Sequence, residues 1–110
     1  DGLAMSSRNK HLSAQHRRDA LVLSAGLERA RELIGKGILD RESITSEIEK
    51  IILSGNPDKI DYISVVKYDD LSYVDTIGEK VVIALAAFWG STRLIDNMVV
   101  EKAGDGYKCV

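Results

Sequence analysis

Two adjacent hydroxyls and a guanidinium stand near the start of the chain, at Ser6, Ser7 and Arg8. Hydroxyls and backbone amides donate hydrogen bonds to phosphate oxygens, and a guanidinium adds charge-assisted, often bidentate contacts. The first 18 residues carry four basic side chains against one acidic one, a net charge of +3, so that the rest of the chain carries −5. The pattern suits a polyphosphate ligand at this strip, but on composition alone a solvated loop in front of a helix cap is the stronger interpretation.

The other polar candidates indicate structure or solvation. His11 and His16 are five residues apart, a poor spacing for one helical face, so a metal site is not expected there. Arg93 and Asp96 are expected to pair with each other or to contact a further domain. A run of acidic residues at Asp69, Asp70 and Asp75 is expected to be solvated.

Three single residues near the end of the chain have simple interpretations. Trp89, beside a predicted turn, is expected to anchor packing, and Gly90 to supply a positive φ in that turn. Cys109 is expected to react only because it is exposed.

Length and composition limit the class of protein. The 110 residues predict one domain, and the net charge of −2 argues against a dedicated nucleic-acid binder. The single cysteine can make no internal disulfide, and the longest uncharged run, 81–92, is shorter than the roughly 20 residues of a membrane span. The chain opens without Met inside its most distinctive stretch and without a signal-peptide pattern, so we expect a cytoplasmic piece of a longer protein.

Two helices are predicted in the first half of the chain. The first begins near Ser13, a suitable N-cap, and ends at Gly35 and Gly37. The second runs from Asp40 to Ser54, with a short link that predicts an antiparallel helix pair. Their apolar stripes, at spacings of three and four, are Ala20, Leu23, Leu27, Ala30 and Ile34, and then Ile44, Ile48, Ile51 and Ile52.

The second half of the chain has the β-branched content of strands. Strands are predicted at 60–68, 81–88 and 93–100, the middle one so apolar that both of its faces should be covered. The last segment, 101–110, has two glycines and is predicted to be a loose tail. The expected fold is α+β, with two N-terminal helices followed by a three-stranded antiparallel sheet that carries the helices on one face.

Three separated motifs resemble the pantothenate synthetase (pantoate–β-alanine ligase) family. The first is Asp1-Gly2-Leu3-Ala4-Met5-Ser6-Ser7-Arg8-Asn9, followed by His11-Leu12-Ser13. The second is Asp61-Tyr62, and the third is Gly90-Ser91-Thr92-Arg93-Leu94-Ile95-Asp96-Asn97. The motifs occur in the family's order, and the likeness leaves 101–110 without a counterpart.

The resemblance implies that residues 1–110 are the C-terminal domain of a two-domain ligase, with 1–12 as a phosphate-contacting loop. The family's N-terminal domain is Rossmann-like and carries a His-x-Gly-His motif and the pantoate pocket, which this sequence lacks. In the family reaction the carboxylate of pantoate attacks the α-phosphate of ATP, with Mg²⁺ assisting, to give pantoyl adenylate and pyrophosphate. The amine of β-alanine then releases AMP, while the C-terminal domain acts as a hinged lid over ATP.

By the same resemblance, Ser6, Ser7 and Arg8 contact the ATP phosphates, Arg8 is catalytic, and the backbone of Met5 lies near the adenine. The triplet is the counterpart of the Lys-Met-Ser-Lys-Ser loop of class I aminoacyl-tRNA synthetases. Serine stands where that loop has lysine, so charge neutralisation falls more heavily on Arg8. ATP and Mg²⁺ are held mainly by the N-terminal domain, which also makes the homodimer contacts. The isolated domain is therefore expected to be a monomer without turnover.

Two other interpretations remain. A small protein-interaction domain would dock a partner on its sheet or helix face and bind anions on its basic loop only incidentally. The lid of another adenylate-forming transferase would share the loop but not the motif at 90–97. Neither interpretation involves a nucleic acid or a membrane.

Overall fold

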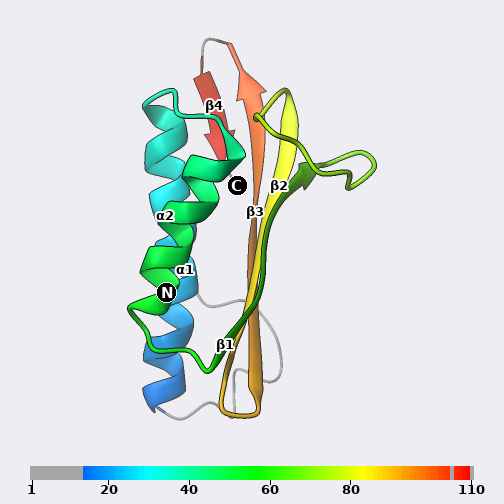
Figure 1. Ribbon diagram of the computed structural model, residues 1–110. Coiled ribbons are helices and arrows are strands. Elements are labelled where there is room, and N and C mark those ends of the chain that lie inside the picture. The colour runs from blue at the N-terminus through cyan, green and yellow to red at the C-terminus, as the bar shows by residue number, and fades with distance from the viewer. Residues whose placement is uncertain (1–13, 105, 110) are drawn as a thin grey trace.

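The computed structural model describes residues 14–104 and 106–109, with side chains from Arg17 onward, as two helices on one face of an antiparallel sheet (Figure 1). The helices are α1 (Ala14–Gly35) and α2 (Arg41–Leu53). The strands, in their order across the sheet, are β1 (Lys59–Lys67), β2 (Lys80–Trp89), β3 (Thr92–Ala103) and β4 (Gly106–Cys109). The predicted α+β arrangement is confirmed, and neither described helix is long and apolar enough to cross a membrane.

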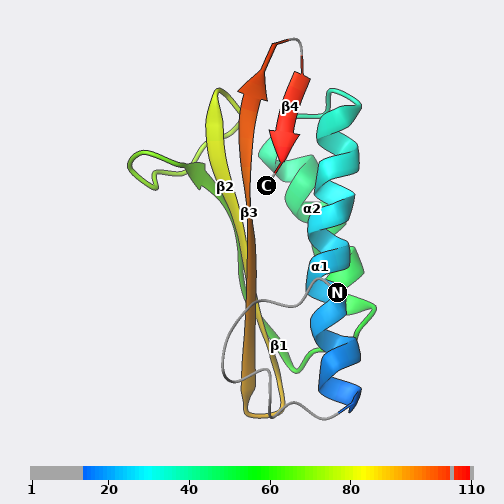
Figure 2. The ribbon, with the colours of Figure 1, turned by 180° about the vertical axis from the view of Figure 1, so that it is seen from behind.

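The sheet has four strands rather than the predicted three, because the residues expected to form a loose tail are structured. β3 continues to Ala103, and β4 turns back to pair with it. Gly104 has a φ of 59°, which glycine adopts easily, so a glycine that suggested looseness makes a tight turn instead. The hydroxyl of Tyr107 donates to the carbonyl of Gly78 at 3.1 Å and ties β4 to the start of β2. Figure 2 shows β4 between β3 and the C-terminal half of α1.

The helix ends follow the predicted stop and start signals. At the end of α1 the amide of Ile38 donates to the carbonyl of Leu33 at 3.0 Å, and Gly37 has a φ of 84°. This is a Schellman motif, which satisfies carbonyls that the helix leaves unpaired. α2 begins after Asp40, whose carboxylate accepts from the amide of Ser43 at 2.9 Å. Hydrogen bonding to Ser43 holds the pKa of Asp40 below its usual value.

The core lies between the helix pair and the odd-numbered residues of β2. Three of the four predicted stripe residues of α2, Ile44, Ile48 and Ile52, are fully buried in it, whereas Ile51 is only half-buried and lies outside the core. Gly26 lets α1 approach both neighbours, because a Cβ there would lie 3.2 Å from a methyl of Ile48 and 3.8 Å from Leu85. The residues that β2 contributes are Val81, Ile83, Leu85, Ala87 and Trp89.

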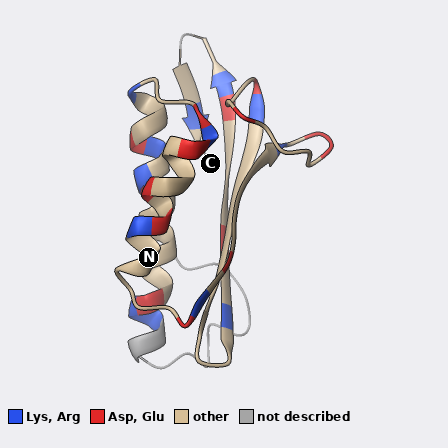
Figure 3. Ribbon diagram, viewed as in Figure 1, with Lys and Arg blue, Asp and Glu red and all other residues tan. Residues whose placement is uncertain are grey.

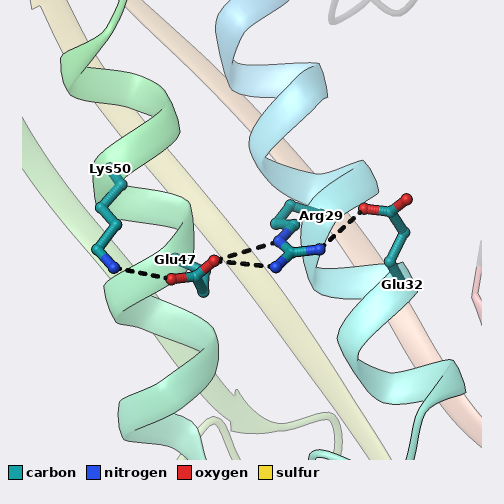
Figure 4. Close-up of polar contacts among 4 residues, drawn as sticks. All are labelled: Arg29, Glu32, Glu47 and Lys50. Carbon is teal, nitrogen blue, oxygen red and sulfur yellow. Dashed lines mark hydrogen bonds and ion pairs between the residues drawn. The ribbon is translucent and has the colours of Figure 1, made fainter.

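An ion-pair network joins the two helices on the side away from the sheet (Figure 4). Nε and Nη2 of Arg29 in α1 donate to one oxygen of Glu47 in α2, at 3.2 and 3.1 Å. Lys50 donates to the other oxygen of Glu47 at 3.1 Å, and Glu32 lies 3.4 Å from Arg29. Hydrogen bonds from Lys50 and then from Arg29 hold the pKa of Glu47 below its usual value. Glu32 and Lys50 are mostly exposed and contribute little stability, while the half-buried Arg29–Glu47 pair links α1 to α2.

Gly55, between α2 and β1, packs against α1 so closely that a larger residue would force a shift. A Cβ at Gly55 would lie 2.8 Å from Cγ2 and 3.2 Å from Cβ of Val22, and a valine Cβ cannot move without its helix. We expect Gly55→Ala to lower the free energy of unfolding by about 1–3 kcal/mol, measured by urea denaturation.

Gly78→Ala is the matched control, because a Cβ there has no neighbour within 4 Å. It should change the free energy of unfolding by less than about 0.5 kcal/mol. Equal stability of the two variants would show that α1 is not packed against the 54–58 connection in this way.

Candidate functional site

One end of the molecule gathers the start of α1, the 54–58 connection between α2 and β1, and the 90–91 turn between β2 and β3 (Figure 1). We call it the hairpin end. The third sequence motif, 90–97, forms this turn and the first half of β3. The hairpin end is also where the chain enters α1 from the predicted phosphate-contacting strip. The predicted ATP-contacting residues lie outside the residues that the structure describes. They are Met5, Ser6, Ser7 and Arg8.

The turn between β2 and β3 is held firmly to the 54–58 connection. Nε1 of Trp89 donates to the carbonyl of Gly55 at 2.9 Å, and the Trp89 side chain is buried. The amide of Gly90 donates to the carboxylate of Asp58, whose own amide donates to the carbonyl of Phe88 at 2.8 Å. Gly90 has a φ of 64°. The predictions that Trp89 anchors packing and that Gly90 supplies a positive φ are both confirmed.

Arg93 does not pair with Asp96, which was one of the two predicted arrangements. Its Nε donates to the carboxylate of Asp61 in β1 at 2.9 Å, and its guanidinium lies 5.8 Å from the ring centre of Tyr62. Residues three apart in a strand point to opposite faces of the sheet, so Arg93 and Asp96 cannot meet. The sequence did not indicate Asp61 as the partner, because a β-bulge between Ile60 and Tyr62 sets its position.

Asp96 is a half-buried carboxylate in β3, where it pairs with Leu85 near the middle of β2. It lies on the helix side of β3, on the same face as the buried Leu94 and Met98. Its carboxylate accepts from the amide of Asn97 at 2.8 Å. Burial raises the pKa of Asp96, and the hydrogen bond from Asn97 offsets this only in part. A half-buried charge that costs stability is typical of functional sites, although structural networks also produce it.

Asp19 is an acidic residue near the hairpin end, and it was not singled out in the sequence. It lies in the second turn of α1 and is the buried charged residue of the described core, with 6% of its surface exposed. Asp19, Arg17 and Arg18 each have a polar or electrostatic partner. The available signal was its position four residues before Leu23, which places a charge on the apolar stripe of the helix.

The acidic residues between β1 and β2 are exposed, as predicted. Asp70 accepts from the amide and hydroxyl of Ser72, at 3.0 and 2.7 Å, and these bonds lower the pKa of Asp70. Asp75 lies 3.7 Å from Arg41. Within the described part of the chain no three His, Cys, Asp or Glu side chains gather as they would around a metal ion. His11 and the side chain of His16 lie outside that part.

Cys109 is not the exposed thiol that its predicted place in a loose tail implied. It is half-buried in β4 and packs against the core. Burial raises the pKa of Cys109, the nearby Arg31 lowers it, and Glu28 raises it. A thiol with a raised pKa forms less thiolate near neutral pH, so its reactivity is lower than exposure alone would give.

A broad groove of about 880 Å³ lies at the opposite end of the strands from the hairpin end. Its lining mixes lysines and acidic residues, among them Lys80 and Glu101, whose charged atoms lie 3.3 Å apart. The ammonium of Lys80 also lies 3.8 Å from the ring centre of Tyr68. Charges that neutralise each other within the groove favour no anionic or cationic ligand, so the hairpin end remains the better candidate.

Comparison with known proteins gives the fold a family context. A family model described as pantoate-beta-alanine ligase matches residues 1–99. The pantothenate synthetase of Caldicellulosiruptor saccharolyticus is 48% identical over 101 residues, and that of Acetivibrio thermocellus is 50% identical over 101 residues. Each alignment covers 92% of this chain but 36% of the relative, so the chain spans little more than a third of their length.

The fold is also similar to solved structures. The crystal structure of pantothenate synthetase from Thermus thermophilus superposes with a TM-score of 0.79 at 30% identity. The superposition covers 87% of this chain and 34% of that one.

The raised pKa of Asp96 predicts that its ionised carboxylate destabilises the fold, which can be tested in the isolated chain. Because its folded-state pKa lies above the unfolded value near 3.8, ionisation of Asp96 destabilises the fold as the pH rises through that range. We expect Asp96→Asn, which keeps an acceptor for the Asn97 amide, to raise the midpoint of thermal unfolding at pH 7. The gain should shrink as the pH approaches 3.8. A gain independent of pH, or a loss at pH 7, would contradict this account.

Proposed function

Because this chain belongs to the pantoate–β-alanine ligase family, we propose that it is the domain that closes over ATP in an enzyme that joins pantoate to β-alanine. The supporting observation is the family match over residues 1–99, which includes the Ser6-Ser7-Arg8 strip together with the whole helix pair and most of the sheet. The other two-thirds of such an enzyme would bind pantoate and β-alanine and make the homodimer contacts. The enzyme would work in the cytoplasm.

The strip would act in the first chemical step. When the carboxylate of pantoate attacks the α-phosphate, negative charge moves onto the leaving pyrophosphate. The hydroxyls of Ser6 and Ser7 and the guanidinium of Arg8 would donate to that charge, and donors placed there stabilise the transition state more than the ground state. The backbone of Met5 would lie near the adenine.

The described structure is compatible with this arrangement. α1 follows the strip and has no acidic residue in its first turn, so no side chain of that turn offsets the positive end of the 22-residue helix. The turn at Gly90 is fixed to Asp58, so this end would move as one body. A domain that closes as one body excludes water, which protects an acyl adenylate from hydrolysis.

Mg²⁺ enters the proposal only as the ion that accompanies the ATP phosphates. The residues that the structure describes gather no set of three or more metal-binding side chains. Mg²⁺ would be held mainly by the ATP phosphates and the rest of the enzyme.

The role of Arg8 is tested in a full-length ligase that carries this chain as its C-terminal part. We expect Arg8→Ala to slow formation of the adenylate by about 10²–10³-fold, because a single donor to developing charge has this effect, and to leave the unfolding midpoint unchanged. Single-turnover kinetics measures the step.

Arg31→Ala is the control, since Arg31 lies on an exposed face of α1 and pairs with Glu28 at 3.3 Å. It should keep the parent rate. Parent-like kinetics in Arg8→Ala would remove the assigned role.

The 110-residue chain by itself should bind ATP weakly and form no pantothenate, because most nucleotide contacts would belong to the rest of the enzyme. Titration with millimolar ATP, followed by nuclear magnetic resonance, should shift amide signals within residues 3–10 and few others. Submicromolar binding or turnover by the chain alone would contradict the proposal. A complete lack of shifts would favour the protein-interaction domain instead.

A further inference from the structure

The sheet face that points away from the helices carries an unusual row of apolar residues. The even-numbered residues of β2 lie on this outer face, and Val82, Ala84, Ala86 and Phe88 are all apolar. The sequence predicted that both faces of this strand would be covered, yet in the described structure the helices lie only on the odd-numbered side (Figure 1). Figure 3 shows that β2 carries no charge beyond its first residue. One face of the central strand is therefore built for burial but has no cover among the described elements.

Neighbouring strands extend this row into a patch. Tyr62 of β1 and Ile95 of β3 lie on either side of Ala86, and Val99 lies beside Val82. Ala86 is 0% exposed although it is outside the helix-side core, so its neighbours on the outer face already cover it. Tyr62 and Ile95 remain 38% and 46% exposed. We call Tyr62, Val82, Ala86, Phe88, Ile95 and Val99 the outer patch.

Paired charges border the outer patch at both ends of the strands. Arg93 and Asp61 form their 2.9 Å pair at the hairpin end, and Lys80 and Glu101 form their 3.3 Å pair at the other end. Ser64 and Asn97 flank Ala84 between the residues around Ala86 and those around Val82, so the face combines two apolar groups with polar residues between and around them. Apolar groups within a polar surround are the usual anatomy of a protein interface. The residues that carry the family resemblance contribute to it, since the second motif supplies Tyr62 and the third supplies Arg93 and Ile95.

The length of the relatives indicates what covers the patch. The chain spans 36% of the relatives it matches, so most of such a polypeptide lies outside it. A stable dimer of separate chains needs roughly 800 Å² of buried surface on each partner, and the exposed part of this patch centres on two side chains. A covalently attached domain acts at an effective concentration in the millimolar range, so a smaller patch suffices.

We propose that the outer patch is the surface on which this domain packs against the nucleotide-binding remainder of the ligase chain. This inference rests on the proposed function, because that function supplies the second domain. The helix face would then point to solvent, and the hairpin end would lie at the margin of the interface.

Cysteine accessibility tests the inference without relying on catalysis. Cys109 is first replaced by Ser, since it is the only cysteine in the chain. Ile95→Cys then reports on the outer patch. Leu53→Cys is the matched control, because Leu53 is an apolar residue of α2 that is 53% exposed on the helix side. Each variant is made in the 110-residue chain and in a full-length chimera in which the chain replaces the matching part of the Caldicellulosiruptor saccharolyticus synthetase.

We expect a maleimide to label Ile95→Cys at least tenfold more slowly in the chimera than in the 110-residue chain, with Leu53→Cys labelled equally fast in both. Equal labelling of Ile95→Cys in both would overturn the inference. Slow labelling of Ile95→Cys in the short chain would overturn it too. A labelling rate that depends on protein concentration would show that a second copy covers the outer patch. A rate independent of concentration would show that the chain covers the patch itself. Tyr62→Cys serves as a second reporter if circular dichroism shows that Ile95→Cys does not fold.

The same chimera, without the added cysteines, separates this inference from the proposed function. If the chimera catalyses ATP–pyrophosphate exchange but Ile95→Cys is not protected from labelling, the interface is rejected and the proposed function is kept. Protection without exchange would keep the interface and reject the function.

Discussion

The packing of the helix pair against the odd-numbered residues of β2 is the constraint on which the rest of this structure depends. A single sheet with helices on one side has only two layers, so one face of each strand has to supply the core. The isoleucines of α2 reach that core directly, and Gly26 brings α1 close enough to reach it as well. The direction of α1 then places its first turn at the hairpin end.

Much of the fold could be predicted because its signals are local. Helical spacing, the Asp40 cap and the Gly37 stop act within a few residues of chain, and the structure confirms them. β4 was missed because four residues are too few to show alternation, and because Gly104 is equally consistent with a tight turn and a loose tail. The separation of Arg93 and Asp96 could have been predicted from the two-residue period of a strand. The pairing of Arg93 with Asp61 could not, because it depends on a bulge.

Less of the candidate site than of the fold could be predicted from local sequence signals. The comparisons confirm the family that the motifs indicated. The functions of Met5 to Arg8 came from that resemblance, since hydroxyls beside an arginine are also common in solvated loops, and those functions stay predictions. The structure adds what periodicity could not show, which is the fixed attachment of the 90–91 turn to Asp58 and a half-buried Asp96 farther along β3. Rigidity there would let a closing domain carry its contacts to the nucleotide without deforming.

The shortness of β4 has a consequence for the solubility of the chain. β4 pairs only with Val100 to Ala103, so among the described strands nothing pairs with the first eight residues of β3 on the edge away from β2. An unpaired strand edge is a template for fibril growth. Here the carboxylate of Asp96 already accepts from the amide of Asn97, so an incoming strand would find that donor occupied and would pack beside a charge. The same motif residue that interrupts the apolar helix-side face of β3 would thus act as a gatekeeper against amyloid-like stacking.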